Sequence, residues 1–156
     1  MPSRTFGGAP IEIASRWQVI HLPLVSARPL KLEPYISVDE TTFFALSNDI
    51  TSLKGEPLRK GGSDVGLNEL DYGDVVYRFQ DGGGLEEITK EAFVVVLGNV
   101  AVPFDTLASF IKEQDSAAFV RVGFLVSPEF GLAFDRTCPC WVTAIAEHCV
   151  DTWKLL

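Results

Sequence analysis

A tight glycine-rich turn that follows an alternating pattern of side chains is the feature of this sequence that most constrains its fold. Val75, Tyr77 and Phe79 alternate with Val76, Arg78 and Gln80, which is the period of a strand with one buried face. Residues 81–84 then read Asp-Gly-Gly-Gly, and glycine supplies the positive φ that hairpin turns need. The pattern therefore predicts a hairpin of two antiparallel strands.

Short strand patterns and turn residues recur along the rest of the chain. Strands are expected at residues 16–24, 30–38, 67–72, 75–80, 85–89, 93–97, 119–126 and 132–134. Apolar residues three or four apart predict helices at residues 39–54, 105–114 and 141–155. Strands and helices do not alternate regularly, so we expect an α+β fold, an antiparallel sheet with two to three helices packed mainly on one face.

Two of the expected helices have recognisable starts, and their apolar stripes predict part of the core. Ser37 followed by Glu40 resembles a capping box for the first helix, and Asp105 suits the N-cap of the second. A chain of 156 residues suits one domain, residues 1–156. Its expected core residues include Phe44, Ile50, Val76, Phe110, Phe124 and Trp153.

Composition limits the compartment and the partners of this protein. The net charge of −8 argues against nucleic acid or an anionic membrane as partner, because both need a basic face. No apolar run is long enough to span a bilayer, and residues 1–10 lack the apolar stretch of a signal peptide. The odd, clustered set of cysteines (Cys138, Cys140 and Cys149) fits a reducing compartment. We therefore expect a cytoplasmic protein.

Most of the negative charge lies between residues 64 and 91, hereafter the acidic block. Eight acids and two bases give this segment −6 of the total −8. Acids beside tyrosines are typical of protein-binding surfaces, and an acidic surface speeds association with a basic partner such as a nuclease. The expected partner-binding residues are Asp64, Glu69, Asp71, Tyr72, Asp74, Tyr77, Asp81 and Glu86. The simpler alternative is a solvated surface that favours solubility.

Residues suited to catalysis or metal binding are few. Cys138 and Cys140 are separated by one residue, less than the usual spacing of zinc ligands. On the expected helix, His148 and Cys149 would point about 100° apart, and His148 would lie too far from Cys140 to act as its base. We therefore expect no catalytic residue, no bound metal, no cofactor and no enzymatic activity, with a Cys/His metal protein as one alternative.

Several short motifs resemble known families. Gly55-Glu56-Pro57, Leu70-Asp71-Tyr72-Gly73 and Leu85-Glu86-Glu87-Ile88 lie within residues 36–90, which resemble the helix-plus-sheet unit of β-lactamase-inhibitor-like proteins. With the hairpin at residues 123–134, the chain is also similar to small cytoplasmic immunity proteins of bacterial polymorphic-toxin and contact-dependent growth inhibition systems. That resemblance implies a protein that binds and neutralises one cognate toxin. The alternative is an acidic protein-interaction domain of a regulatory assembly.

Overall fold

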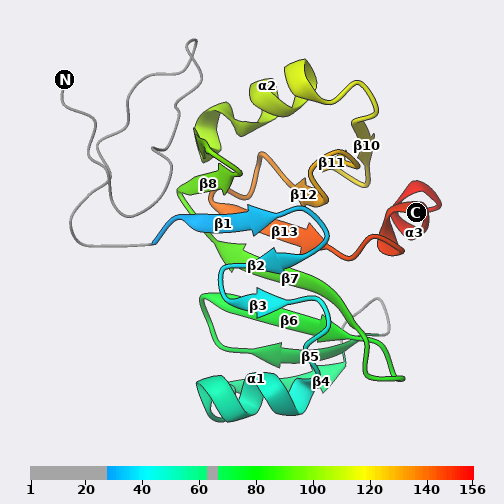
Figure 1. Ribbon diagram of the computed structural model, residues 1–156. Helices are drawn as coiled ribbons and strands as arrows, with labels where there is room; N and C mark the ends of the chain where they lie inside the picture. Colours follow the sequence, from blue (N-terminus) through cyan, green and yellow to red (C-terminus); the bar gives the residue numbers. More distant parts are fainter. Residues whose placement is uncertain (1–27, 63–66) are drawn as a thin grey trace, which may run out of the picture.

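The computed structural model describes residues 28–62 and 67–156, which form two sheets and three helices (Figure 1). The helices are α1 (Ser47–Lys54), α2 (Phe104–Gln114) and α3 (Cys149–Lys154). The strands are β1 (Leu30–Glu33), β2 (Ser37–Val38), β3 (Thr41–Thr42), β4 (Arg59–Gly62), β5 (Asn68–Asp71), β6 (Val75–Phe79), β7 (Leu85–Glu91), β8 (Val94–Leu97), β9 (Val100–Pro103), β10 (Phe119–Arg121), β11 (Phe124–Ser127), β12 (Leu132–Phe134) and β13 (Trp141–Ile145). The expected α+β class is confirmed, with two sheets in place of one.

The larger sheet has eight strands in the order β10-β11-β12-β13-β7-β6-β5-β4, and every neighbouring pair is antiparallel. At its centre, Ile88 of β7 lies between Tyr77 of β6 and Ala144 of β13. The hairpin predicted around residues 81–84 is confirmed as the β6–β7 connection, where Gly83 has a φ of 91°.

The smaller sheet has five strands in the order β3-β2-β1-β8-β9 and crosses one face of the larger sheet (Figure 1). Its β1 and β8 are parallel, with Leu30 opposite Val95, and its other pairs are antiparallel. Leu30 and Val95 are buried in the same apolar cluster as Tyr77 and Ile88 of the larger sheet. The main core therefore lies between the two sheets.

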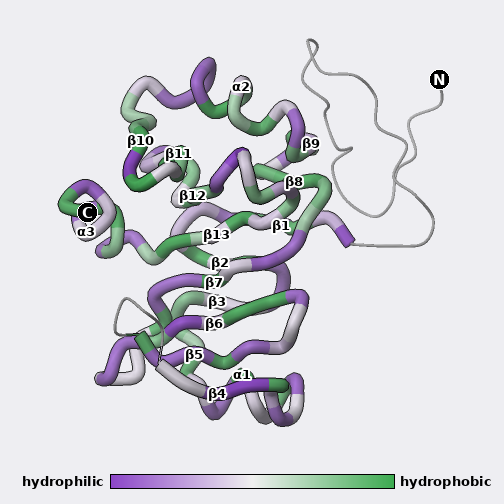
Figure 2. Tube along the Cα trace, turned by 180° about the vertical axis from the view of Figure 1, so that it is seen from behind, coloured by the Kyte–Doolittle hydropathy of each residue, from purple (hydrophilic) through white to green (hydrophobic). Residues whose placement is uncertain are grey.

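Alternate side chains of β6 point to opposite faces of the larger sheet, as the sequence predicts. Val75, Tyr77 and Phe79 are buried, whereas Val76 and Arg78 are half-buried on the other face. Val76 was expected in the core, so its partial exposure corrects that expectation. Hydropathy also differs between exposed and buried strands. The exposed edge strand β4 carries hydrophilic residues, whereas the buried strand β8 is hydrophobic (Figure 2).

A half-buried tyrosine joins the two sheets where a tight turn leaves room for it. Tyr35, between β1 and β2, donates a hydrogen bond from its hydroxyl to the carbonyl of Pro128, between β11 and β12. Burial raises the pKa of Tyr35 to about 12. Its ring lies against Gly131, where a Cβ atom would approach Tyr35 Cε1 to 2.9 Å and where φ is 62°. Glycine is therefore required at this position for both space and backbone conformation.

The first helix is much shorter than the sequence predicts. The helix expected at residues 39–54 begins only at Ser47, and the preceding segment forms β2, β3 and a turn in which Asp39 has a φ of 52°. The β-branched Thr41 and Thr42 pair with β2 instead of continuing a helix. The predicted capping box is wrong, because the helix is capped by the Asp49 carboxylate, which accepts a hydrogen bond from the Leu46 amide at 2.8 Å.

This shift in the helix start also changes which side chains are buried. Phe44, expected in the core, is 88% exposed, so that prediction is wrong. Ile50 is buried as expected. The two predictions differ in outcome because residue 44 precedes the helix, so its spacing from Ile50 is not helical spacing.

The last predicted helix, residues 141–155, is also partly wrong. Its first five residues form β13, which pairs with β7 over Trp141–Ile145 because aromatic and β-branched residues suit a strand. Only Cys149–Lys154 is helical, and Trp153 is buried there as expected. The single strand expected at residues 119–126 is two strands, because Val122 and Gly123 have positive φ and turn the chain. Phe124, expected in the core, is half-buried against Trp153.

Helix α2 matches its prediction closely. It begins one residue before Asp105, with Pro103 rather than Asp105 at the N-cap, and buries Leu107, Phe110 and Ile111. The strand expected at residues 16–24 lies outside the described residues. Within the described residues, no helix combines the length and apolar character needed to cross a membrane.

A matched pair of phenylalanine truncations tests this placement of the core. Phe110 is 5% exposed and its ring centroid lies 5.8 Å from that of Phe130. We expect Phe110→Ala to lower the free energy of unfolding by about 3–5 kcal/mol. Phe44→Ala, at an exposed position, should change it by less than about 0.5 kcal/mol. Urea unfolding measures both values, and similar losses for the two variants would contradict this arrangement.

Candidate binding groove

The face of the larger sheet that the smaller sheet does not cover carries a groove of about 750 Å³. Its lining includes Arg78, which points away from the buried Tyr77 because neighbouring strand residues face opposite sides. The groove floor, as we define it, consists of polar side chains from four strands: Glu69, Arg78, Glu87, Thr89 and Thr143. Cross-strand pairing brings these residues together, since Arg78 lies opposite both Glu69 and Glu87, and Thr89 opposite Thr143.

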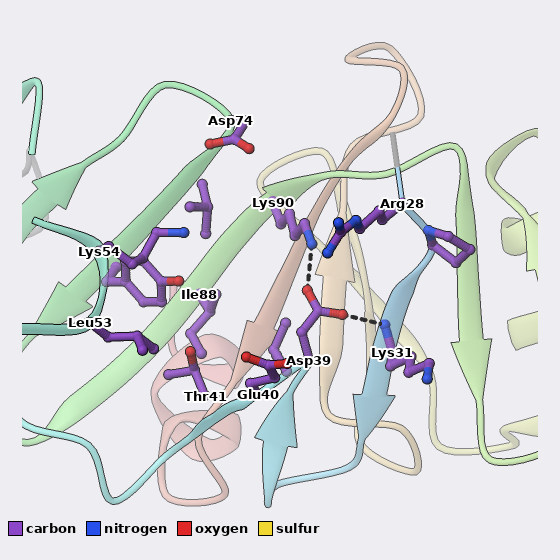
Figure 3. Close-up of a pocket in the computed structure, with 14 residues that line it drawn as sticks. Arg28, Lys31, Asp39, Glu40, Thr41, Leu53, Lys54, Asp74, Ile88 and Lys90 are labelled. Atoms are coloured by element: carbon purple, nitrogen blue, oxygen red, sulfur yellow. Dashed lines mark hydrogen bonds and ion pairs between the residues drawn. The ribbon is translucent and has the colours of Figure 1, made fainter. Parts of the chain in front are cut away.

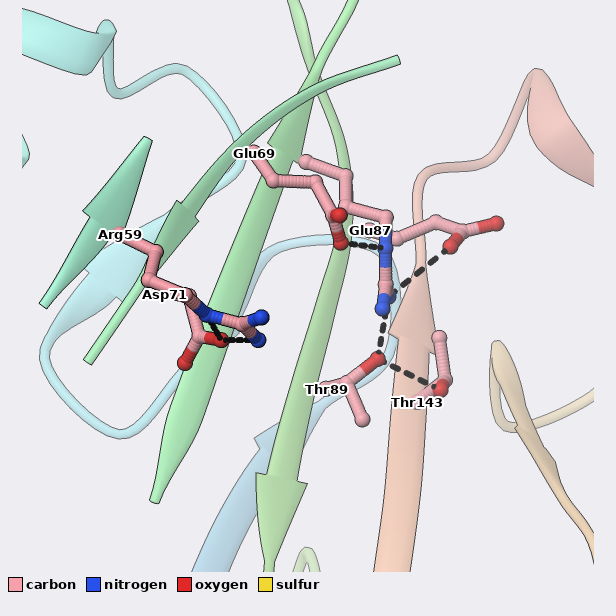
Figure 4. Close-up of polar contacts among 7 residues, drawn as sticks. Arg59, Glu69, Asp71, Glu87, Thr89 and Thr143 are labelled. Carbon is pink, nitrogen blue, oxygen red and sulfur yellow. Dashed lines mark hydrogen bonds and ion pairs between the residues drawn. The ribbon is translucent and has the colours of Figure 1, made fainter. Parts of the chain in front are cut away.

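Arg78 is the centre of a hydrogen-bond network on the groove floor, and its partners Glu69, Glu87 and Thr89 are labelled in Figure 4. Its Nε donates to Glu69 Oε2 at 2.8 Å, and its Nη1 donates to Thr89 Oγ1 at 2.7 Å and to Glu87 Oε2 at 3.4 Å. The Thr89 and Thr143 hydroxyls are 2.8 Å apart, which extends the network to β13. One guanidinium therefore positions two carboxylates and two hydroxyls across the sheet.

The carboxylates of the groove floor are partly removed from water. Burial raises the pKa of Glu87, and the attraction of Arg78 opposes that rise. An ion pair in a partly buried position is sensitive to the loss of either partner, so Arg78 favours the charged form of Glu87.

Apolar and aromatic side chains form the walls of the groove. Phe124 and Trp153 contact each other edge to face, with ring centroids 5.3 Å apart. Trp141 lines the groove beside them, and Val122 adds an apolar side chain that is 69% exposed. Aromatic walls around a carboxylate floor can bind a cationic side chain through both charge and ring contacts.

One end of the groove contains a buried carboxylate in an irregular part of β7. Arg78 pairs with Glu87 and Phe79 with Leu85, so Glu86 is the extra residue of a β-bulge. Its Oε1 lies 2.6 Å from His148 Nε2, and its Oε2 accepts a hydrogen bond from the Cys149 thiol. Burial and the hydrogen bond to Glu86 raise the pKa of the Cys149 thiol well above its usual range. Without a bound metal ion, the thiol is therefore protonated at neutral pH.

A second cavity, of about 570 Å³, lies between the two sheets and has the opposite character (Figure 3). Its lining has a small excess of positive charge, from four cations and three carboxylates: Arg28, Lys31, Lys54, Lys90, Asp39, Glu40 and Asp74. Asp39 accepts hydrogen bonds from the Lys90 ammonium and, at 2.9 Å, from the Lys31 amide. Asp74, Tyr77 and Ile88 also line this cavity, so it lies on the face of the larger sheet opposite the groove.

The residues predicted to bind a partner are divided between these two faces. Glu69 and Glu86 line the groove, whereas Asp74 and Tyr77 line the basic cavity. Tyr77 and Glu86 are buried, so neither presents its side chain on an open surface. Asp64 lies outside the described residues.

The other three predicted residues make contacts within the chain near the β4 edge. Asp71 forms an ion pair with Arg59, and together with the Gly73 amide this holds the pKa of Asp71 below its usual range. The Tyr72 hydroxyl donates to the Gly55 carbonyl at 2.8 Å. Asp81 accepts from the side chain of Asn68 at 3.2 Å. The linear acidic block is therefore not one continuous surface, and a partner-binding role for its residues remains a prediction.

Sequence reasoning missed several residues that shape the groove. Arg78 and Glu87 were visible in the acidic block, but a hairpin register was needed to pair them across β6 and β7. Trp141 and Thr143 were assigned to a helix and so were not placed beside β7. Their aromatic and β-branched character was the available signal for a strand.

The cysteines occupy different environments from those considered in the sequence. Cys138 is exposed at the groove, and Cys140 is half-buried with a φ of 69°. Across the described parts of the chain, the group of side chains close enough to share a metal ion is Glu86, His148 and Cys149, with all three ligand atoms within 4.8 Å of one another. This group includes neither Cys138 nor Cys140.

Comparison of this chain with protein-family models, with curated proteins and with solved structures finds no match.

The groove-floor network makes a pH-dependent prediction for Arg78→Met. This change leaves Glu69 and Glu87 without their cation, and we expect it to lower the free energy of unfolding at pH 7 by about 2–4 kcal/mol. The loss should shrink as the pH falls toward 4.5, the ordinary pKa of glutamate. Burial already raises the folded-state pKa of Glu87, so without Arg78 the folded protein gains stability by taking up a proton as the pH falls.

Urea unfolding of both proteins at pH 7 and pH 5 measures this difference. The double variant Arg78→Met/Glu87→Gln is the control, and it should recover part of the stability at pH 7 because the unpaired charge is removed. An equal loss at both pH values would show that Arg78 acts through packing and not through its charge.

Proposed function

We propose that this chain is a cytoplasmic immunity protein that binds a cognate protein toxin and neutralises it by holding a basic segment of the toxin in the groove. The observation that carries this proposal is the combination of a carboxylate floor with aromatic walls on the uncovered face of the larger sheet. This combination suits a basic protein better than it suits nucleic acid or an anionic membrane.

Charge is the first support for a basic partner. The described lining of the groove contains four carboxylates and one guanidinium: Glu69, Glu86, Glu87, Asp135 and Arg78. Arg78 is already shared between Glu69 and Glu87, so the lining has an excess of negative charge. A concave surface focuses this potential, attracts basic side chains and repels phosphate groups. The groove is accordingly unsuited to nucleic acid or to an anionic membrane.

The aromatic walls are the second support. Tryptophan is enriched among the residues that dominate binding energy in protein interfaces, and its ring attracts arginine and lysine. Trp141 and Trp153 both line the groove, and the exposed Val122 extends the apolar rim. An arginine or lysine of the partner would contact carboxylates at its charged end and rings along its stem.

The sequence resemblance supports a toxin as the partner. A nuclease toxin is basic where it holds phosphate, so an acidic groove that covers this region would block its substrate. The free thiols of Cys138, Cys140 and Cys149 fit the reducing cytoplasm, where such a toxin would act. An acidic interaction domain of a regulatory assembly would use the same groove. The identity of the partner therefore distinguishes such a domain from an immunity protein.

Two single substitutions on α3 test the groove. Thr152 is an exposed residue that lines the groove, so Thr152→Arg places a cation there without disturbing the core. Asp151→Asn also raises the net charge by one, but Asp151 is not among the lining residues. We expect Thr152→Arg to weaken binding of the product of the adjacent gene by about tenfold and to reduce protection from its toxicity. Asp151→Asn should change the affinity by less than about twofold.

Surface plasmon resonance at low and high salt provides the affinity and the association rate. The association rate of the wild-type protein should fall as salt rises, because screening weakens charge steering. Equal weakening by both substitutions would show that net charge matters and the groove does not. If the product of the adjacent gene neither binds this protein nor is neutralised by it, the proposed immunity function is wrong.

A further inference from the structure

We propose that Glu86, His148 and Cys149 bind a zinc ion, with a fourth coordination position open to solvent. This site goes beyond the proposed immunity function, since it requires no partner protein.

The geometry brings together residues from two separate segments. Glu86 Oε1 is 2.6 Å from His148 Nε2, Glu86 Oε2 accepts from the Cys149 thiol, and all three ligand atoms lie within 4.8 Å of one another. Ligand atoms around a tetrahedral zinc ion are about 3.3–3.7 Å apart, given bond lengths near 2.0–2.3 Å. Shifts of about 1 Å in these side chains would therefore admit the ion.

The backbone explains how adjacent residues can share one ion. His148 is the N-cap residue of α3, with φ of −68° and ψ of −14°, and Cys149 is the first residue of the helix. Their side chains reach different oxygens of the same carboxylate, because Glu86 presents Oε1 to His148 and Oε2 to Cys149. The β-bulge supplies the third ligand, because it makes Glu86 an extra residue in β7. The Ala146 amide donates to the Glu86 carbonyl at 2.8 Å, which holds the loop before α3 against the bulge.

The chemistry of the three ligands selects among metals. Sulfur, imidazole nitrogen and a single carboxylate form a set that suits zinc, whereas magnesium and calcium prefer oxygen ligands throughout. Thiolate and carboxylate together would neutralise the two charges of the ion. On binding, the Cys149 sulfur exchanges its proton for the metal bond, and that proton passes to solvent.

Burial gives the site a closed side and an open side. Glu86 and Cys149 are more than nine-tenths buried, whereas the His148 side chain is 59% exposed. An ion can therefore enter beside His148, and water can occupy the fourth position. Glu86 and Cys149 also line the groove, which places the site at its end.

Zinc titration of the reduced, chelator-treated full chain tests this site. We expect one zinc ion per chain in competition with a fluorescent chelator, and a cobalt(II) derivative with a thiolate-to-metal charge-transfer band. His148→Ala should weaken zinc binding by at least about tenfold, and Cys149→Ser should abolish the charge-transfer band. Because the His148 side chain is largely exposed, His148→Ala leaves the fold intact, which circular dichroism verifies.

The matched control is the double variant Cys138→Ser/Cys140→Ser, which removes the two cysteines outside the cluster. Its zinc affinity and its cobalt spectrum should equal those of the wild type. The site is refuted if the wild type does not bind one zinc ion per chain, if His148→Ala leaves the affinity unchanged, or if the control variant alone abolishes binding. These measurements use the free chain, so a negative result leaves the proposed toxin binding untouched, and failure to bind a toxin leaves the zinc site untouched.

Discussion

The packing of the smaller sheet onto one face of the larger sheet is the constraint on which the rest of the structure depends. Tyr77 and Ile88 of the larger sheet share a core with Leu30 and Val95 of the smaller one. Because strand residues alternate, this burial directs Arg78 and its neighbours to the opposite face. That face carries polar side chains, and the groove there is lined by residues of β5, β6, β7 and β13 and of α3.

A single guanidinium makes such a face possible. Arg78 satisfies Glu69, Glu87 and Thr89 at once, so the groove floor has no unpaired cation and keeps an excess of carboxylates. The acidic block is likewise not one surface. Asp74 precedes β6 and lines the basic cavity on the other side, and Asp71 is paired with Arg59. Charge that is contiguous in sequence is thus divided between the two faces of the sheet and an ion pair with the edge strand β4.

The sequence predicted those elements whose structure follows from the pattern of residues within the element itself. The β6–β7 hairpin and α2 follow from alternation, glycine turns and an apolar stripe. The apolar side chains of residues 141–145 also fit the period of a helix, and only their pairing with β7, some fifty residues earlier, selects the strand. The Glu86–His148–Cys149 cluster could not be predicted from the sequence either, because it depends on a β-bulge and on where α3 begins.

The central claim is that the groove, and not the basic cavity, binds the partner. Nuclear magnetic resonance of the tryptophan indole N–H groups during titration with the adjacent gene product tests it most directly. Trp141 and Trp153 line the groove, so their indole signals should shift or broaden on binding, while the amides of Thr41 and Lys54 at the basic cavity should not. Shifts confined to Thr41 and Lys54, with both indole signals unchanged, would contradict the claim.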